Sequence, residues 1–191
     1  MVRKMGVKVA DAFIGLGTNL GDRAKQLRRA VAAMAALEDN ALVAVSHVYE
    51  TPPVGPTKQA PFYNAVAHLR TAAEPEPLLD HLRQIERSAG RSPIGARMKW
   101  GPRELDLDIL LYGDVVFKQA DLRIPHPHMT ERWFVLRPLA DVAAERRHPV
   151  LGRRISELLA AIEAESDASS SGRGHRVDVV LVPGSQCPEG G

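Results

Sequence analysis

The sequence predicts an α+β fold built around a mostly antiparallel sheet. Helical and strand-like stretches are mixed along the chain, and they do not alternate regularly as they would in a parallel βαβ fold. Proline-rich loops separate several of them, and we find no internal repeat in the 191 residues. A chain of this length forms one domain with a substantial core. We expect that domain over residues 1–165, followed by a linker and C-terminal tail over residues 166–191.

The first predicted unit is a strand, a loop and a helix. Residues 7–15 have the pattern of a strand, and residues 15–22, rich in glycine and asparagine, follow as a loop. Asp22 is a suitable N-cap for the next helix. In that helix, apolar residues recur every three or four positions and predict a buried stripe of Leu27, Ala30, Val31, Met34 and Leu37.

Two strands and a second helix come next. Residues 41–49 and 62–69 have strand patterns, and the prolines between them exclude regular structure there. Pro75 and Pro77 suit the start of a helix, and Gly90 suits its end. The predicted buried stripe of this helix consists of Leu78, Leu79, Leu82, Ile85 and Ala89.

The second half of the chain is less regular. Residues 105–112 form the next predicted strand, and residues 155–165 form a short helix. A loop rich in proline and histidine opens the region 123–138, and residues 166–174 have the composition of a flexible linker. Residues 177–182 either add a last strand or belong to a loose tail, and the sequence does not decide between these alternatives.

Composition places the chain among ordinary globular proteins. Hydrophobic residues make up 45% and charged residues 25%, which argues against a disordered or collagen-like chain. The net charge of +2 is too small to indicate a nucleic-acid partner, and no apolar run is long enough to cross a membrane. The single cysteine, Cys187, has no partner for an intrachain disulfide. We therefore expect a cytoplasmic protein without a signal peptide. We also expect a monomer, although no feature of the composition indicates the oligomeric state.

Asp106 and Asp108 carry the clearest chemical signal. Because side chains two apart in a strand share a face, both carboxylates point one way while Leu105, Leu107 and Ile109 point into the core. Two neighbouring carboxylates repel each other unless a cation lies between them, and Mg²⁺ favours such oxygen ligands together with phosphates. Alternating Asp and Leu also occurs on solvated strands, so the pair alone does not establish a metal site.

Basic residues precede this pair. The sequence Trp-Gly-Pro-Arg ends at Arg103, and its rigid turn would hold that guanidinium at the mouth of the carboxylate site, where it can bind phosphate oxygens. Arg83, Arg87 and Arg91 recur every four residues along one helix. Such a stripe is usually a solvated face, but its position directly before the Asp pair favours a nucleotide contact by Arg91.

Two histidines lie beyond the strand. His126 and His128 are spaced as zinc ligands can be, but no cysteine or third histidine is near them in the sequence. A hydrogen bond from His126 to a phosphate and simple exposure of His128 are the better readings, and Arg132 adds a further phosphate contact. Neither a Walker motif nor a Rossmann glycine pattern is present. A nucleotide must therefore be held by side chains and a metal.

Six blocks of sequence, in this order, support a more specific interpretation. They span residues 17–22, 49–55, 62–66, 90–91, 100–108 and 125–136. Together they closely resemble the 6-hydroxymethyl-7,8-dihydropterin pyrophosphokinase family, over about residues 7–160. The resemblance implies a ferredoxin-like αβα sandwich. It also implies transfer of pyrophosphate from ATP to the hydroxymethyl group of the pterin, with release of AMP, in folate biosynthesis.

The resemblance further implies roles for individual residues. Asp106 and Asp108 would bind two Mg²⁺ ions that bridge the ATP phosphates and the pterin hydroxyl, and Arg91 and Arg103 complete the implied catalytic set. The residues implied for ATP binding are Glu86, Arg91, Trp100, Arg103, Ile109, His126 and Arg132. The residues implied for pterin binding are Thr51, Pro52, Val54, Phe62, Asn64, Asp106 and Phe134. The rings of Phe62 and Phe134 would lie on either side of the pterin, and ordinary core packing is the alternative for both.

Some points stay open at this stage. The loop over residues 92–99 is longer than the usual family spacing, and Pro93 stands where the family commonly has a basic residue, so Arg97 or Lys99 would have to substitute. Trp100 and this loop are expected to close on substrate. The proton of the pterin hydroxymethyl could pass to Asp108 or to water, and the sequence does not rank the two.

Two rival functions use the same features differently. A glycosyltransferase also holds a metal and a nucleotide sugar with an Asp-x-Asp pattern, but this reading leaves the Trp-Gly-Pro-Arg block unexplained. An RNA-binding module of ferredoxin-like fold would use the basic segment over residues 83–103. That module expects stacking aromatic residues on adjacent strands, and the sequence lacks their pattern.

Overall fold

A computed structural model describes residues 9–53, 59–90, 101–167 and 174–181 of the chain. Its elements, in chain order, are β1 (Ala10–Thr18), α1 (Arg23–Ala35), β2 (Asn40–Val45), β3 (Val48–Thr51), β4 (Phe62–Thr71), α2 (Pro75–Ser88), β5 (Asp106–Tyr112), β6 (Phe117–Lys118), β7 (Arg123–Ile124), the 3-10 helix η2 (Met129–Glu131), α3 (Trp133–Ala143), α4 (Ile155–Asp167) and β8 (His175–Val177). Among the described helices, none is both long and apolar enough to span a membrane.

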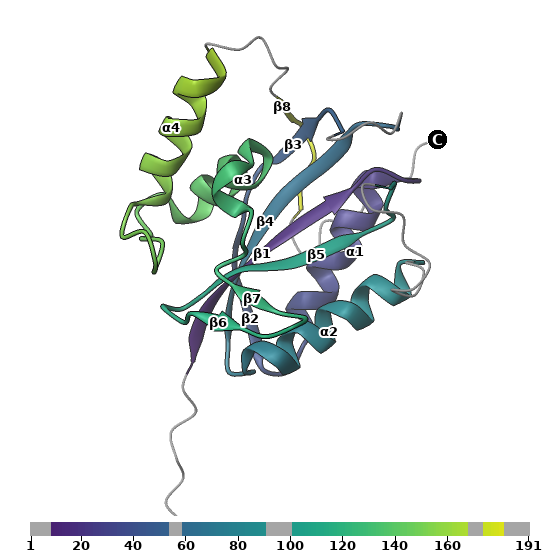
Figure 1. The fold of residues 1–191 in the computed structure, drawn as a ribbon. Coiled ribbons are helices and arrows are strands. Elements are labelled where there is room, and N and C mark those ends of the chain that lie inside the picture. Colours follow the sequence, from purple (N-terminus) through teal and green to yellow (C-terminus); the bar gives the residue numbers. More distant parts are fainter. Residues whose placement is uncertain (1–8, 54–58, 91–100, 168–173, 182–191) are drawn as a thin grey trace, which may run out of the picture.

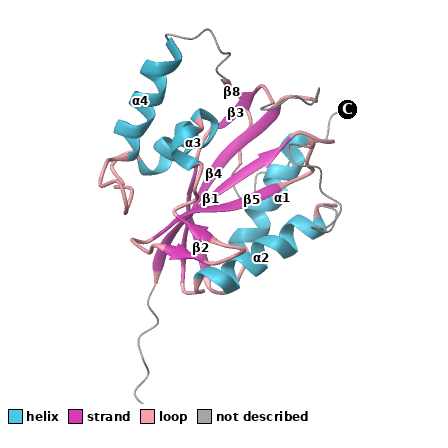
Figure 2. Cartoon of the chain, viewed as in Figure 1, coloured by secondary structure: helices cyan, strands magenta, loops and turns pink. Residues whose placement is uncertain are grey.

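The centre of the molecule is a six-stranded sheet in the order β5-β1-β4-β3-β8, in which β2 also pairs with β4. Every pairing in it is antiparallel. Helices α1 and α2 cover one face, and α3 and α4 cover the other, so the molecule has three layers (Figures 1 and 2). The predicted α+β class and the mostly antiparallel sheet are confirmed.

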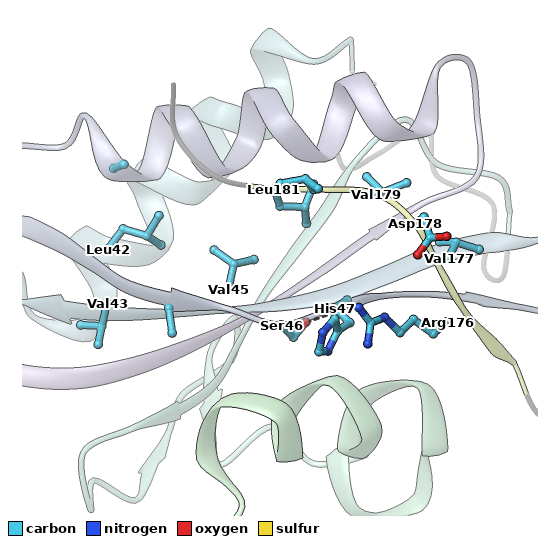
Figure 3. Close-up of a pocket in the computed structure, with 13 residues that line it drawn as sticks. Leu42, Val43, Val45, Ser46, His47, Arg176, Val177, Asp178, Val179 and Leu181 are labelled. Carbon is cyan, nitrogen blue, oxygen red and sulfur yellow. Dashed lines mark hydrogen bonds between the residues drawn. The ribbon is translucent and has the colours of Figure 1, made fainter. Parts of the chain in front are cut away.

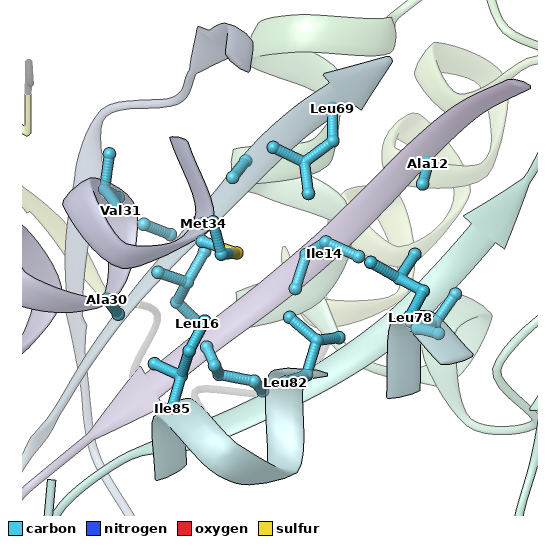
Figure 4. Packing of buried hydrophobic residues seen from close by; sticks show 14 of the residues in the cluster. Ala12, Ile14, Leu16, Ala30, Val31, Met34, Leu69, Leu78, Leu82 and Ile85 are labelled. Carbon is cyan, nitrogen blue, oxygen red and sulfur yellow. The ribbon is translucent and has the colours of Figure 1, made fainter. Parts of the chain in front are cut away.

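The core between the sheet and helices α1 and α2 follows the predicted stripes. Leu27, Ala30, Val31 and Met34 of α1 are buried, as are Leu78, Leu82 and Ile85 of α2. They pack against inward-facing residues of β1 such as Ile14 and Leu16 (Figure 4). The carboxylate of Asp22 accepts a hydrogen bond from the backbone N–H of Lys25, at 2.9 Å, and so caps α1 as predicted. Gly90, with φ of 95°, follows the end of α2.

Strand β1 differs from the prediction. It continues through Gly15 and Gly17 to Thr18, where the sequence had suggested a loop. Glycine weakens a strand that stands alone, but β1 is paired along its length with β4 on one side and β5 on the other. Ladder hydrogen bonds on both edges therefore hold the two glycines extended.

The single strand predicted over residues 41–49 is also wrong. The chain leaves the sheet edge at Ser46 and His47, and β2 and β3 form separately along the same side of β4. Ser46 still bonds to β4, because its hydroxyl accepts from the N–H of Val66 at 2.8 Å. The N–H of His47 instead donates to the carboxylate of Asp141, in α3, at 3.2 Å. At Ser46 a side-chain hydroxyl thus replaces a backbone carbonyl, and at His47 the backbone N–H turns to α3, so the regular ladder is interrupted at these two residues.

The remaining predicted elements lie close to their expected positions, whereas the sequence did not predict β6, β7, η2 or α3. Strand β5 starts at Asp106, one residue later than expected, and α4 extends to Asp167. The loop before Phe134 is followed directly by α3, which contains Pro138. The C-terminal region does add a strand, but that strand is His175–Val177, before most of the region that the sequence left open.

Candidate active site

The register of the sheet places the two carboxylates beside two glycines. Gly17 of β1 is opposite Asp106 of β5 on one side and Asn64 of β4 on the other. Gly15 is likewise opposite Asp108. Neither glycine projects a side chain above the sheet. Gly17 therefore leaves space between Asn64 and Asp106, whereas the side chain of Leu110 lies over Gly15.

Asp106 and Asp108 project from the face of the sheet that α3 and α4 cover in part. Leu107 and Ile109, which alternate with them, are buried in the core under α1 and α2, as predicted. Asp108 is exposed, whereas the side chain of Asp106 is 21% exposed. Both carboxylates border a cavity of about 70 Å³ near the start of α3.

Arg103 lies next to this pair, as the rigid turn before β5 predicted. One of its guanidinium nitrogens forms an ion pair with the carboxylate of Asp106. Its backbone is fixed by Asn19, whose side-chain oxygen accepts from the N–H of Arg103 at 2.7 Å and whose N–H donates to the carbonyl of Arg103 at 3.0 Å. The guanidinium is therefore held at the edge of the carboxylate site.

The donor set suits magnesium better than zinc. Within the described residues, no group of three or more His, Cys, Asp and Glu side chains could hold a metal ion. Two carboxylates on one face are nevertheless enough for Mg²⁺, which keeps several waters and takes further ligands from phosphates. Asp106 and Asp108 therefore fit Mg²⁺ only together with a phosphate-bearing ligand.

A second cavity, of about 150 Å³, adjoins the first and gathers most of the residues predicted for the pterin. Its lining includes Thr51, Pro52, Phe62, Asn64, Asp106 and Phe134, together with Arg103 and Arg132. Phe62 starts β4 and Phe134 lies in the first turn of α3. Neither ring belongs to the buried core. The alternative hypothesis, that Phe62 and Phe134 pack in the hydrophobic core, is therefore wrong.

The polar wall of this cavity is preorganised. Asn64 is 7% exposed and Thr51 is 5% exposed, and the side-chain amide of Asn64 donates to the Thr51 hydroxyl at 2.8 Å. Because the side-chain N–H of Asn64 is bonded to Thr51, the side-chain oxygen of Asn64 points away from Thr51 and is available to accept a hydrogen bond from another group. The wall therefore presents fixed polar atoms beside two aromatic rings, which suits a flat heterocycle with a polar edge.

His126 lies on the opposite side of the carboxylates, at the boundary between two cavities. The backbone N–H of His126 donates to the carbonyl of Leu110 at 3.0 Å, which fixes the loop to β5. Burial, and then the positive charges of Arg132 and His128, lower the pKa of His126 to about 4, although Asp106 opposes the shift. The ring is therefore neutral at physiological pH. Its Nδ1 accepts from the N–H of His128 at 3.3 Å, which leaves the proton on Nε2 as a donor.

Of the two residues predicted on the adenosine side, Ile109 lines a third cavity, of about 280 Å³, between β5, α2 and the loop before His126, whereas Glu86 does not line it. Ile109, Leu79 and Leu122 line it. Glu86 is 4% exposed, and its carboxylate accepts from the N–H of Leu107 at 2.8 Å, between the two aspartates. Glu86 thus joins the end of α2 to β5, a structural role that the sequence did not predict.

Three predicted site residues, Val54, Arg91 and Trp100, lie outside the described residues, as does the longer loop over residues 92–99. The structure therefore does not place them. Gly101, directly after that segment, lines the pterin-side cavity.

Sequence reasoning missed several residues at this site. Gln59 lines the pterin-side cavity, and its side-chain oxygen accepts from the amide of Asn19 at 3.0 Å. Asn19 is only 3% exposed, and it also donates to the carbonyl of Ala60 at 3.1 Å. It thus joins the segment that ends at Arg103 to the segment before β4. The available signal was its place inside the glycine-rich block after β1.

A larger cavity, of about 810 Å³, lies apart from all of these residues. It is formed by β2, the end of α1 and the segment after β8 (Figure 3). Of the residues predicted for ATP, pterin or metal that the structure describes, none borders it. Its size therefore does not make it the candidate active site.

Comparison of the sequence with known proteins identifies one family. The sequence model of the 7,8-dihydro-6-hydroxymethylpterin-pyrophosphokinase family matches residues 13–144. The 2-amino-4-hydroxy-6-hydroxymethyldihydropteridine pyrophosphokinase of Pseudomonas aeruginosa is 45% identical over 153 residues, which cover 80% of this chain and 92% of that protein. The enzyme of the same name from Bacillus subtilis is 42% identical over 134 residues, covering 70% of this chain and 78% of that protein.

Solved structures show the same fold at lower identity. Wild-type HPPK-DHPS of Plasmodium falciparum with pteroate superposes with a TM-score of 0.69 at 16% identity, and the match covers 88% of this chain. The wild-type protein described without a ligand gives 0.66 at 17% identity and covers 84%. The chain spans less than half of these solved chains, 48% and 46%. From the sequence matches, this chain belongs to the 7,8-dihydro-6-hydroxymethylpterin-pyrophosphokinase family.

Proposed function

We propose that this protein transfers pyrophosphate from ATP to the hydroxymethyl group of 6-hydroxymethyl-7,8-dihydropterin, giving the pterin diphosphate and AMP, in folate biosynthesis. One observation carries the proposal. A cavity walled by two aromatic rings and a fixed amide adjoins a pair of carboxylates and two arginines. A flat polar heterocycle and a polyphosphate are the two ligands that this combination suits. Family membership identifies them as the pterin and ATP.

The pterin is proposed to lie between Phe62 and Phe134. Its amino and amide edge would meet the oxygen of Asn64 and the backbone of Thr51, Pro52 and Val54. Stacking of the heterocycle on two rings contributes affinity, whereas the polar edge fixes its orientation. This orientation would direct the hydroxymethyl group towards Asp106, which borders the same cavity.

Asp106 and Asp108 are the proposed ligands of two Mg²⁺ ions. Bound there, Mg²⁺ would offset negative charge on the ATP phosphates. Arg91, Arg103 and Arg132 are proposed to bind the phosphate oxygens, and the neutral ring of His126 would donate to them from Nε2. The pterin oxygen bonds to the β-phosphorus of ATP while the bond from that phosphorus to the AMP oxygen breaks. The residues act by positioning the two substrates and by stabilising charge.

The nucleotide base and ribose are proposed to occupy the cavity beside Ile109, with Glu86 and the backbone of Ile109 as contacts. Leu79 and Leu122 form an apolar part of its lining beside Ile109, which supports an adenine position there. Trp100 and the loop over residues 92–99 are proposed to close on the bound substrates. The hydroxymethyl proton would leave to Asp108 or to water.

Four broader features are also proposals. The order β1-α1-β2/β3-β4-α2-β5, with β1 and β4 central, supports a ferredoxin-like sheet to which α3 and α4 add a third layer. Residues 1–165 would form the pyrophosphokinase domain, with residues 166–191 as linker and tail. We propose a monomer. We also propose a cytoplasmic location, because the substrates are those of a central biosynthetic pathway.

The direct test is AMP formation from ATP. Purified protein is incubated with ATP and Mg²⁺, with or without 6-hydroxymethyl-7,8-dihydropterin. We expect AMP only when the pterin is present. AMP that forms equally without the pterin, or no AMP in either case, would contradict the proposal. A nucleotide sugar with a hydroxylated acceptor serves as the comparison for a glycosyltransferase.

A further inference from the structure

Strand β8, which follows α4 in the chain, belongs to the central sheet, although it lies outside the part of the chain that matches the family model. Strand β8 pairs with β3, so that His175 is opposite Glu50 and Val177 is opposite Val48. Beyond β8 the chain runs alongside α1 (Figure 3), where Leu181 is 4% exposed and the side chain of Arg28 donates to the carbonyl of Val180 at 3.1 Å. The family match ends at residue 144.

Gly174, just before β8, makes an unusually close contact with β3. A methyl group at this position would overlap the carbonyl oxygen of Glu50 and Cγ2 of Thr51. The obstacle on one side is backbone, which cannot rotate away as a flexible side chain can. The contact therefore requires glycine for steric reasons, and it sets how closely β8 approaches Thr51.

Thr51 connects Gly174 with the candidate pterin cavity. Its methyl group lies against Gly174, and its hydroxyl accepts from the amide of Asn64 at 2.8 Å. Both side chains are buried, so neither exchanges this partner for water. With its N–H held by Thr51, Asn64 places its oxygen on the side of Gly17, a position that lines the cavity.

We propose that Gly174 is a positioning residue for the pterin site: by packing on the methyl of Thr51, it fixes the threonine hydroxyl and thereby the direction in which Asn64 offers its oxygen. The inference rests on the proposed function. It assigns to the C-terminal segment a part in selecting heterocycles with an N–H edge. The proposed nucleotide site beside Ile109 lies on the other side of the carboxylates, and neither Gly174 nor Thr51 lines that cavity.

The test compares Gly174→Ala with Arg176→Ala in the full chain. Arg176 lies two residues further on, within β8, and its side chain is exposed, so its loss leaves the contact between Gly174 and Thr51 intact. For Gly174→Ala we expect KM for the pterin to rise about tenfold, as for one misplaced hydrogen bond, with the Kd of ATP within about twofold of wild type. Arg176→Ala should match wild type in both. Equal loss of pterin and ATP affinity, or no loss of either, would overturn the proposal.

Two further measurements keep the proposal testable if Gly174→Ala does not fold or if the enzyme assay fails. Thr51→Val keeps the branched shape against Gly174 but removes the acceptor for Asn64, and it should also raise KM for the pterin without changing the Kd of ATP. If Thr51→Val has the pterin kinetics of wild type, the inference is overturned. The second measurement is hydrogen exchange at the backbone amides, which needs no substrate and so can be made even if the enzyme assay fails.

In the exchange experiment, Gly174→Ala should speed exchange at the amides of β3, and Arg176→Ala should not. Suppose that Gly174→Ala speeds exchange at β3 but the wild-type protein makes no AMP. The proposed function would then be contradicted, whereas the packing of Gly174 on β3 would be supported. Unchanged exchange and unchanged pterin KM in an active enzyme would overturn the role of Gly174.

Discussion

Asp106 and Asp108 share one face of β5 but have different surroundings. Asp106 is partly buried and forms an ion pair with Arg103, whereas Asp108 is exposed at the edge of the neighbouring cavity. Arginine next to Asp106 stabilises its negative charge. A site with one shielded and one accessible carboxylate can hold a cation while admitting a phosphate ligand from solution.

Substitution of either aspartate should remove catalysis without unfolding the protein. In Asp106→Asn and in Asp108→Asn, loss of one carboxylate weakens metal binding, and we expect AMP formation to fall at least about 100-fold. Neither residue is in the buried core, so the midpoint of thermal unfolding should stay near that of wild type. Asp80→Asn, with a side chain that is 69% exposed on α2, is the control. Retained activity in either site variant would exclude the metal role.

The two rings of the pterin-side cavity should act on one substrate only. Phe134→Ala removes one face of the proposed ring sandwich, and we expect pterin affinity to fall about tenfold or more, with a smaller change for ATP. Phe134→Leu keeps an apolar side chain of similar reach and should give an intermediate loss. Isothermal titration with each ligand measures the two affinities. A larger loss for ATP than for the pterin would count against the sandwich.

His126 should lower the stability of the protein at mildly acidic pH. Its pKa in the folded chain is about 4, against an ordinary value of 6.5. Between these pH values the unfolded chain binds a proton that the folded chain does not. The contribution of this residue to the free energy of unfolding is therefore full above about pH 6.5 and decreases as the pH falls towards 4.

The variant His126→Asn lacks this proton uptake. Its free energy of unfolding should fall less than that of wild type between pH 7 and pH 4.5, as measured by urea unfolding. NMR titration of the ring in the wild-type protein should show a midpoint near pH 4. If the free energy of unfolding had the same pH dependence in both proteins, or if the NMR midpoint lay near 6.5, the low pKa of His126 would be contradicted.

At the scale of elements, a polar cluster fixes α3 to the sheet. The Tyr49 hydroxyl donates to the carboxylate of Asp141, with its oxygen 3.1 and 3.0 Å from the two carboxylate oxygens, and Arg137 donates to both residues. Burial raises the pKa of Tyr49, which keeps the hydroxyl protonated as a donor. Because Phe134 lies one turn before Arg137 on α3, the cluster also sets the position of that ring over the cavity.

Removal of the Tyr49 hydroxyl should affect both stability and pterin binding. In Tyr49→Phe, the carboxylate of Asp141, 8% exposed, loses a donor, and we expect a loss of about 1–3 kcal/mol in the free energy of unfolding. KM for the pterin should rise as α3 loosens. Tyr63→Phe is the matched control on β4. Equal stability of the two variants would show that the cluster does not hold α3.

At the scale of the whole molecule, local patterns in the sequence predicted what is local in the structure. Both apolar stripes, the cap at Asp22 and the orientation of Asp106 and Asp108 depend on neighbours within a few residues, and all agree with the structure. The split between β2 and β3 coincides instead with a contact of His47 to Asp141, about ninety residues away. No periodicity in residues 41–49 contains that information.

At the candidate site, too, the sequence predicts local features better than contacts between distant segments. The six blocks of sequence gave most of the residues that line the two connected cavities, because each block carries its residues together. Gly15 and Gly17 were assigned to a loop, since only pairing on both sides of β1 makes them a strand. The low pKa of His126 and the contact of Gly174 with Thr51 arise from packing between distant segments.

The most direct test of the proposed function is the fate of the ATP phosphates. Wild-type protein is supplied with Mg²⁺, 6-hydroxymethyl-7,8-dihydropterin and ATP labelled with ³²P at either the α or the γ position. Transfer of an intact pyrophosphoryl group predicts that γ label appears on the pterin, that α label remains in AMP, and that the two products form in equal amounts. Label on the pterin accompanied by ADP, or no label on the pterin at all, would contradict the function proposed here.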